Sequence, residues 1–407
     1  MTLDPTRRIV LRGMIGAAGV FSFLADASAQ QPDWDAMLRA ARGKTVYWNA
    51  WAGDERTNAF IAWAGERVVE RFGITVRHVR LRDTAEAVAR VVAEKAAGRE
   101  EGGGVDLIWI NGPNFLAMKG QHLLFGPLVD RLPNFTLVDV VGKRSTVIDF
   151  TIPVDGYAVP WRMAQIVFIY DAARIKEPPR SAAEMLNWAR ANPGRLTHPG
   201  IRNFLGVTFL KQALHELTID PEMLQSAPRD DNFDVVSAPL WDWYDALRPL
   251  LWRRGQQFPE TGPAQRTLMN DGEIDIMIAF NPSEASTAIA NGQLPETVRS
   301  YVLTRGTIGN TSFLAVPFNA ANKEAAMVLA DFLLSPEAQA HAQDPRVLGN
   351  FTVLDLARLP PADRARFDSL PRGIATLTNA ELGRPLLEPH PDWMTRITAA
   401  WERRYAR

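Results

Sequence analysis

Polar and aromatic side chains follow several predicted strands at the points where those strands end. Together they make up the candidate ligand contacts, which are Trp51, Asp54, Asn58, Asn111, Asn114, Trp161, Asn281, Ser283 and Glu284. A tryptophan ring offers a flat wall for a sugar face, a heterocycle or an organic cation, and carboxylates and amides fix the orientation of the bound molecule. We therefore expect a small polar organic ligand that is cationic, heterocyclic or a polyol, since Asp54 and Glu284 disfavour a phosphate or sulfate.

Each of these residues also has a purely structural explanation. Asp54 and Ser283 are good helix N-caps, and Asn111 stands before Gly112 in an ordinary turn pair. Trp161 lies where the chain is predicted to cross between two lobes, and there it can simply pack in the core. What favours binding is that the same pattern recurs after three separate strands.

Sequence templates for catalysis are missing. The six histidines form no metal-ligand pair at helical spacing, and the chain has neither a Gly-x-Ser-x-Gly nucleophile motif nor a phosphate-binding Walker loop. The glycines at 102–104 precede a strand instead of joining a strand to a helix, so they are no dinucleotide motif. We expect no catalytic residue, no metal and no cofactor. A pair of acids for sugar cleavage, such as Asp54 and Glu284, stays open as an alternative.

The elements that position these residues are strands and helices in alternation. Apolar β-branched and aromatic runs predict strands at 45–51, 74–81 and 105–110, and helical periodicity predicts helices at 58–71 and 84–97. Further buried strands are predicted at 165–170, 273–279 and 312–316, and a helix at 323–334. Near-continuous apolar strands joined by helices are typical of a parallel sheet that is covered on both faces.

This alternation predicts an α/β fold of two lobes, each a mostly parallel sheet flanked by helices, joined by two crossing strands near 157–167 and 299–317. Lobe 1 comprises residues 30–160 and 312–345, and lobe 2 comprises residues 161–311. Residues 346–407 form a helical segment that packs on the lobes.

The first 29 residues read as an export signal. A basic start that contains Arg7 and Arg8 precedes an apolar stretch, and Ala27-Ser28-Ala29 supplies a small-x-small cleavage sequence. The paired arginines, followed by Ile9, Val10, Leu11 and Arg12, resemble the twin-arginine motif. We expect cleavage after Ala29 and a product free in the periplasm; an ordinary secretory signal is the alternative.

Composition excludes several classes of function. Lys and Arg total 45 against 46 for Asp and Glu, a net charge of −1 that does not suit nucleic acid. The absence of cysteine excludes disulfides, thiolate metal sites and cysteine nucleophiles. Hydrophobic residues make up 46% of the chain, which is ordinary for a globular protein.

Several separated motifs resemble those of one family. The segments at 322–326 and 331–339 resemble the closing motif of bacterial extracellular solute-binding proteins, the periplasmic receptors of ABC importers. The segments at 50–58, 106–115 and 280–285 are similar to the YnjB-type branch of that family. The resemblance implies a type II periplasmic-binding fold that closes on a solute and delivers it to an inner-membrane permease with its ATPase. We also expect the protein to be a monomer. An exported carboxylate-dependent hydrolase of carbohydrates and a solute sensor for a membrane receptor are the alternatives.

Overall fold

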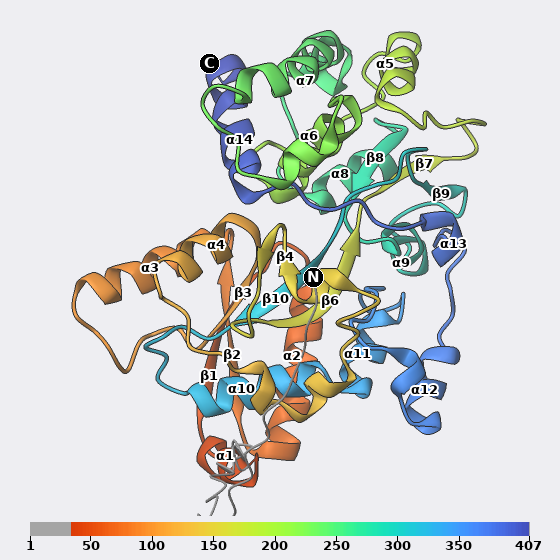
Figure 1. Ribbon diagram of the computed structural model, residues 1–407. Coiled ribbons are helices and arrows are strands. Elements are labelled where there is room, and N and C mark those ends of the chain that lie inside the picture. The colour runs from red at the N-terminus through yellow and green to blue at the C-terminus, as the bar shows by residue number, and fades with distance from the viewer. Residues whose placement is uncertain (1–33, 407) are drawn as a thin grey trace, which may run out of the picture. The chain divides into compact units, whose positions relative to one another are not determined.

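The computed structural model describes residues 34–406, and this part of the chain is organised around two main β-sheets (Figure 1). The first, here called the β1 sheet, has the strand order β2-β1-β3-β10-β6. Its strands are β1 (Thr45–Trp51), β2 (Thr75–Leu81), β3 (Leu107–Ile110), β6 (Val159–Gln165) and β10 (Gly309–Ala315). The predicted parallel start of this sheet is confirmed, because β1 lies parallel to both β2 and β3. β10 then runs antiparallel to β3 and β6.

Hydrophobic side chains cover both faces of the β1 sheet. Along β10, Phe313 and Ala315 belong to one hydrophobic core and Leu314 to the other, since successive residues of a strand point to opposite faces. The helices that contribute to these two cores are α1 (Trp34–Ala41), α2 (Glu55–Phe72), α3 (Ala85–Ala96), α4 (Gly112–Gly120), α10 (Lys323–Leu333), α11 (Pro336–Gln343) and α12 (Pro361–Asp368). A short hairpin of β4 (Ile148–Asp149) and β5 (Ile152–Pro153) lies in the connection to β6.

The second sheet, the β7 sheet, has the order β8-β7-β9. Its strands are β7 (Val167–Asp171), β8 (Ile276–Ala279) and β9 (Val298–Tyr301). The mostly parallel arrangement expected here is wrong, because β7 is antiparallel to both of its neighbours. The one parallel pairing of β8 in the described residues is an isolated bridge between Ile276 and Leu196. Apolar runs report that a strand is buried on both faces, but they do not report its direction.

Two further hydrophobic cores cover the β7 sheet. The helices that supply them are α5 (Ala182–Ala191), α6 (Phe204–Leu217), α7 (Phe233–Leu247), α8 (Gly262–Asn270), α9 (Glu284–Ala290), α13 (Asn379–Leu382) and α14 (Pro391–Tyr405). The last two helices come from the end of the chain. Trp393 and Trp401 of α14 are buried in the core that also contains α6 and α7.

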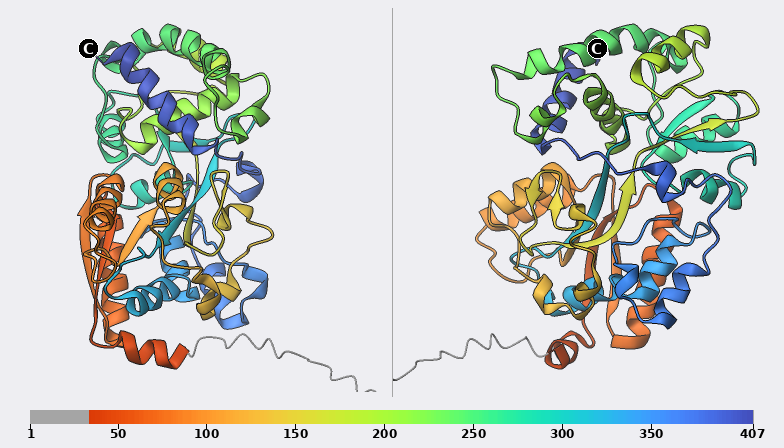
Figure 2. Two further views of the ribbon diagram at one scale, coloured as in Figure 1. Left: turned by 60° about the vertical axis from the view of Figure 1, so that its left-hand side comes forward. Right: turned by 45° about the vertical axis from the view of Figure 1, so that its right-hand side comes forward.

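The chain passes between the two sheets along strands β6 and β10, which pair side by side (Figures 1 and 2). Only Ile166 separates β6 from β7, and its amide donates a hydrogen bond of 2.9 Å to the carbonyl of Ile308 on the returning segment. A third segment joins them, since the amide of Gly309 donates to the carbonyl of Leu386 at 3.0 Å. The connection is therefore a small hydrogen-bonded bundle of three chain segments.

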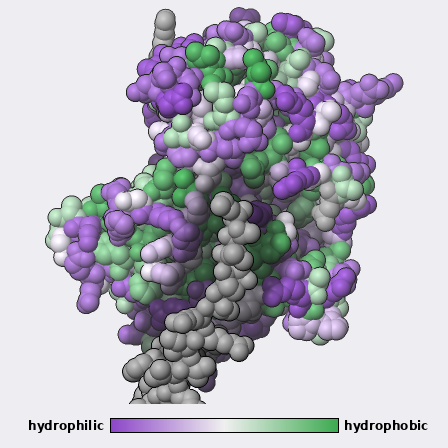
Figure 3. All heavy atoms as spheres, viewed as in Figure 1, coloured by the Kyte–Doolittle hydropathy of each residue, from purple (hydrophilic) through white to green (hydrophobic). Residues whose placement is uncertain are grey.

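On the face of the protein shown in Figure 3, most surface residues are hydrophilic, and hydrophobic residues form smaller groups between them. Among residues 34–406 no helix has the length and apolar character needed to span a membrane. The predicted export signal at 1–29 and its cleavage point lie outside the described residues.

Candidate functional site

The N-terminus of α2 follows strand β1 directly and places the first group of predicted residues. Asp54 is the N-cap, and its carboxylate accepts a hydrogen bond of 2.9 Å from the amide of Arg56. The helix begins at Glu55, earlier than the predicted start at Asn58, because this cap supplies an acceptor for the free amides of the first turn. Asn58 is buried, and its amide group donates to the carbonyl of Ala52 at 3.2 Å and to Glu55 at 3.1 Å. Asn58 thus holds the loop after β1.

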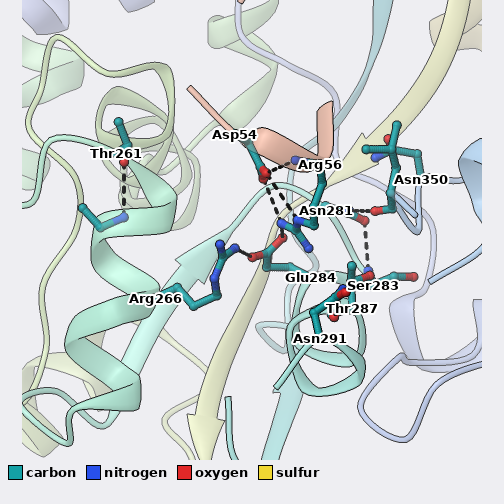
Figure 4. Close-up of polar contacts among 12 residues, drawn as sticks. Asp54, Arg56, Thr261, Arg266, Asn281, Ser283, Glu284, Thr287, Asn291 and Asn350 are labelled. Atoms are coloured by element: carbon teal, nitrogen blue, oxygen red, sulfur yellow. Dashed lines mark hydrogen bonds and ion pairs between the residues drawn. The ribbon is translucent and has the colours of Figure 1, made fainter. Parts of the chain in front are cut away.

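A chain of ion pairs links α2 to the helices of the β7 sheet (Figure 4). The Nη2 atom of Arg56 lies 2.9 Å from Asp54 Oδ2 and 2.8 Å from Glu284 Oε2. Glu284 Oε1 lies 2.5 Å from Nη1 of Arg266 on α8. All four side chains are between 9% and 15% exposed, so water screens these charges only weakly.

The two predicted carboxylates are therefore occupied by arginines. Burial alone would raise the pKa of Asp54, but the hydrogen bonds and charge of Arg56 outweigh burial and hold that pKa below its usual value. Conversely, the two carboxylates raise the pKa of Arg56 although burial opposes this. A glycosidase pair needs one carboxylic acid with a raised pKa. Asp54 has the opposite shift and Glu284 is held by two guanidinium groups, which is not the arrangement of a hydrolase.

Aromatic rings surround a third arginine next to this network. The ring of Trp51 packs edge-on against Trp109 at 6.4 Å, and Trp109 packs edge-on against Trp161 at 5.2 Å. The guanidinium carbon of Arg162 lies 4.0 Å from the ring centre of Trp109 and 4.8 Å from that of Trp161. Cation–π contacts of this kind hold a guanidinium against aromatic rings without using its N–H donors.

Trp161 itself is a core residue in this conformation. It is only 1% exposed and packs against Trp48 at 5.9 Å and Phe60 at 6.0 Å. This packing supports a structural role for Trp161 and not a direct contact with a ligand. Trp51 is partly exposed, so it is the tryptophan of the predicted pair that a solute can reach.

Arg162 lacks the carboxylate partners that neutralise Arg56 and Arg266. Its Nη1 atom donates a hydrogen bond of 3.3 Å to Asn350 Oδ1, while its buried Nε has no partner among the described residues, and no carboxylate there lies within ion-pair distance of it. Burial lowers the pKa of Arg162 to about 9, with the charge of Asp54 partly offsetting that effect. The group stays cationic at neutral pH.

The predicted residues of α9 have structural contacts that fix Glu284. The amide nitrogen of the Asn281 side chain donates to the carbonyl of Leu348 at 2.5 Å, and its Oδ1 accepts from the backbone amide of Ser283 at 3.0 Å. Ser283 is buried and makes no side-chain cap, contrary to its expected alternative role. Both residues thus hold the start of α9, from which Glu284 reaches Arg56 (Figure 4).

The predicted pair on α4 stands apart from the ion-pair chain. Asn111 precedes α4 without capping it, Asn114 lies in its first turn, and both side chains are half-buried. Neither has a side-chain hydrogen bond to any residue in the described part of the chain. Instead the backbone amide of Gly112 donates to Asp149 at 2.5 Å.

A second buried ionic cluster lies beyond α4. Lys211 on α6 donates to Glu388 at 2.6 Å, and their side chains are 0% and 1% exposed. Asn310 of β10 donates to the same carboxylate at 2.8 Å. Burial lowers the pKa of Lys211 and raises those of Glu388 and Asp149, although the lysine charge counteracts the rise in both carboxyl groups. Every charge here depends on its partners, because none is solvated.

Sequence reasoning missed Arg56, Arg162 and Arg266, which carry the positive charge of the site. One signal was available, since Arg56 sits in the first turn of α2, where the helix dipole disfavours a cation. Such a placement points to a nearby carboxylate. Within residues 34–406 no group of three or more His, Asp or Glu side chains is arranged to hold a metal ion. A shallow surface pocket of about 190 Å³, lined by Arg266, Thr267, Asn270 and Gln293, opens beside α8.

Comparison with known proteins agrees with the fold and the motifs. The profile of the bacterial extracellular solute-binding proteins matches residues 63–362. The chain is 38% identical over 393 residues to protein YnjB of Escherichia coli (strain K12), a match that covers 96% of this chain and 98% of YnjB.

Solved structures share the fold at low sequence identity. The TpPotD lipoprotein of Treponema pallidum matches with a TM-score of 0.66 and 14% identity, over 89% of this chain and 100% of that one. The periplasmic binding protein AfuA of Actinobacillus pleuropneumoniae, solved with fructose-6-phosphate bound, matches with a TM-score of 0.61 and 13% identity, over 89% and 99%. The chain belongs to the bacterial extracellular solute-binding proteins, a family whose members bind a solute and do not catalyse a reaction.

Proposed function

We propose that this chain captures a small polar organic solute in the periplasm and passes it to an inner-membrane permease. Capture takes place between two hinged lobes, residues 30–160 with 312–345 and residues 161–311, on which residues 346–407 pack. The observation that carries the proposal is the ion pair of Arg56 with Glu284, because it joins helices that follow strands of the two different sheets.

The crossing segments support a hinge. Periplasmic binding proteins close by rotating two bodies about a few connecting residues, and the connections here are short. Ile166 alone separates strands of the two sheets. A solute shifts such an equilibrium only by binding the closed form more tightly than the open one, so groups from both lobes must face it.

The nine sequence-derived contacts divide into two sets under this proposal. Trp51 contacts the solute, and Asn111 and Asn114 are free to do so because their side chains have no partner in the described residues. The others support the site from behind: they are Asp54, Asn58, Trp161, Asn281, Ser283 and Glu284. At 13% identity AfuA shares the fold, so its bound fructose-6-phosphate does not name the solute here.

The test is to purify the protein from periplasm under native conditions, denature it, and identify the released small molecule by mass spectrometry. Adding that compound back to the emptied protein should reduce the radius of gyration in X-ray scattering, and the compound should be recovered unaltered. Conversion of the compound into a product, or binding without any change in radius, would contradict capture by closure. Co-purification with a permease, and not with a signalling receptor, separates import from sensing.

A further inference from the structure

The charges around the candidate site do not balance. In the ion-pair chain and directly beside it, Asp54 and Glu284 supply two carboxylates, whereas Arg56, Arg162 and Arg266 supply three guanidinium groups. Glu55 is exposed and contacts Asn58 instead of an arginine, so one positive charge in this group has no carboxylate. Arg56 and Arg266 each contact a carboxylate, so the excess falls on Arg162. A largely desolvated cation without a carboxylate partner is costly, and a bound anion would lower that cost.

The free edge of Arg162 has the geometry that an oxyanion needs. The guanidinium carbon of Arg162 lies over the rings of Trp109 and Trp161, and its Nη1 atom donates a hydrogen bond to Asn350. The remaining edge carries Nε and Nη2, neither of which has a hydrogen-bond partner among the described residues. Two parallel N–H groups on one edge match the two oxygens of a carboxylate or of a phosphate group.

We propose that the captured solute is a small organic anion, whose carboxylate or phosphate group binds the Nε/Nη2 edge of Arg162 while its less polar part lies against Trp51. This rests on the proposed function and specifies the class of its solute. The preference for a cationic or hydroxyl-rich solute, expected from Asp54 and Glu284, is reversed, because arginines already neutralise both carboxylates. A single excess positive charge suits a carboxylate, which carries one negative charge.

Arg56 provides the second half of the anion site. Its Nη1 atom is buried and has no partner within residues 34–406, although its Nη2 binds two carboxylates. An anion held between Arg56 and Arg162 would satisfy the donors that the protein leaves open on both.

The experiment uses a bacterial metabolite extract that ion exchange has divided into anionic, neutral and cationic fractions. The emptied protein is melted in the presence of each, and the anionic fraction alone should raise the Tm. Stabilisation by the neutral or cationic fraction instead would overturn the anion assignment while leaving the proposed function intact. Stabilisation by none of the three would overturn the proposed function itself. Treating the anionic fraction with phosphatase separates the two sources, since only a phosphate ester loses its effect.

Substitutions at Arg162 test whether this residue binds the anion. The metabolite identified from the anionic fraction should bind Arg162→Gln about tenfold to a hundredfold more weakly than the natural protein, which corresponds to losing a charge-assisted bidentate contact. Arg162→Lys keeps the charge without the planar edge and should fall between the two. Arg77→Gln, an exposed position on β2, serves as the matched control and should bind normally. Equal affinity in Arg162→Gln and Arg77→Gln would overturn the role of Arg162, provided that both melt cooperatively.

Discussion

Arg56 and Glu284 lie 228 residues apart in the sequence, and their side chains meet at 2.8 Å. One comes from the helix that follows β1 and the other from the helix that follows β8, so the pair connects elements of the two sheets. Each partner has a second contact, Asp54 for the arginine and Arg266 for the glutamate. The pair therefore stabilises any conformation in which the two sheets approach one another.

Glu284→Gln should favour the open form of the solute-free protein. The substitution leaves Arg56 and Arg266 close together without the carboxylate between them, and breaking a largely buried ion pair costs about 2–4 kcal/mol. About 1.4 kcal/mol changes a conformational equilibrium tenfold. X-ray scattering should show a larger radius of gyration than for the natural protein.

Glu337→Gln is the control for this prediction, because Glu337 pairs with Arg71 on elements of the β1 sheet alone. Its radius should match that of the natural protein. An unchanged radius in Glu284→Gln would show that the ion pair does not hold the sheets together.

Placing a methyl group at Gly53 should disturb solute binding through Trp51. A Cβ atom at this position would lie 2.3 Å from Cζ2 of the Trp51 ring, so the ring must move. We expect both Gly53→Ala and Trp51→Ala to lower the affinity for the captured solute, Trp51→Ala by about 1–2 kcal/mol from the lost ring contact. Calorimetric titration measures the change. Tyr47→Ala, which removes an exposed ring from the same strand, should leave affinity intact.

Lys211→Met should be among the most destabilising substitutions. It leaves Glu388, whose carboxylate is 1% exposed, without its cationic partner, at a cost of about 3–5 kcal/mol. Adding Glu388→Gln removes the unpaired charge and should restore much of that loss. Urea unfolding of the two single variants and the double variant gives the coupling energy. A cost below about 1 kcal/mol for Lys211→Met would contradict the account of the cluster as mutually dependent charges.

The free energy of unfolding should depend on pH through the titration of Asp331. Burial raises its pKa to about 6, although Asn134 donates hydrogen bonds to both oxygens and opposes the rise. Because the folded pKa is above the unfolded one, this carboxyl group contributes stability below about pH 4 that is lost as the pH rises through 6. The contribution is on the order of 2–3 kcal/mol.

Asp331→Asn removes this titration. The difference in unfolding free energy between the natural protein and the variant should therefore change between pH 4 and pH 7, with the natural protein losing ground as the pH rises. Chemical denaturation at several pH values measures it. A constant difference over that interval would show that the pKa of Asp331 is not shifted.

Local sequence patterns predicted much of the fold. The run at 45–51 is strand β1 with the same bounds, and the helix expected at 323–334 is α10 at Lys323–Leu333. These elements were accessible because burial imposes its own periodicity on the sequence. The antiparallel course of the β7 sheet was not, because strand direction depends on which distant segments pair, and no pattern within a strand records that.

The site was predicted in part. Strand ends drew attention to Asp54 and Glu284, and the structure brings both into one ion-pair network. The sequence did not show that arginines already pair with these two carboxylates. Arg162, on which the proposed solute class rests, lies on strand β6. The sequence shows neither its contact with the distant Trp109 nor its lack of a carboxylate partner. Partners far apart in the chain determine whether a charge is free or already neutralised.

The packing of α14 on α6 and α7 has a consequence for biosynthesis. Trp393 and Trp401 complete the core that covers α6 and α7, and Leu386 hydrogen-bonds to the crossing segment. The core over α6 and α7 therefore cannot be completed until the ribosome has made and released α14, long after α6 and α7 themselves have been synthesised. Until then, the apolar side chains of α6 and α7 that Trp393 and Trp401 cover stay open to other contacts.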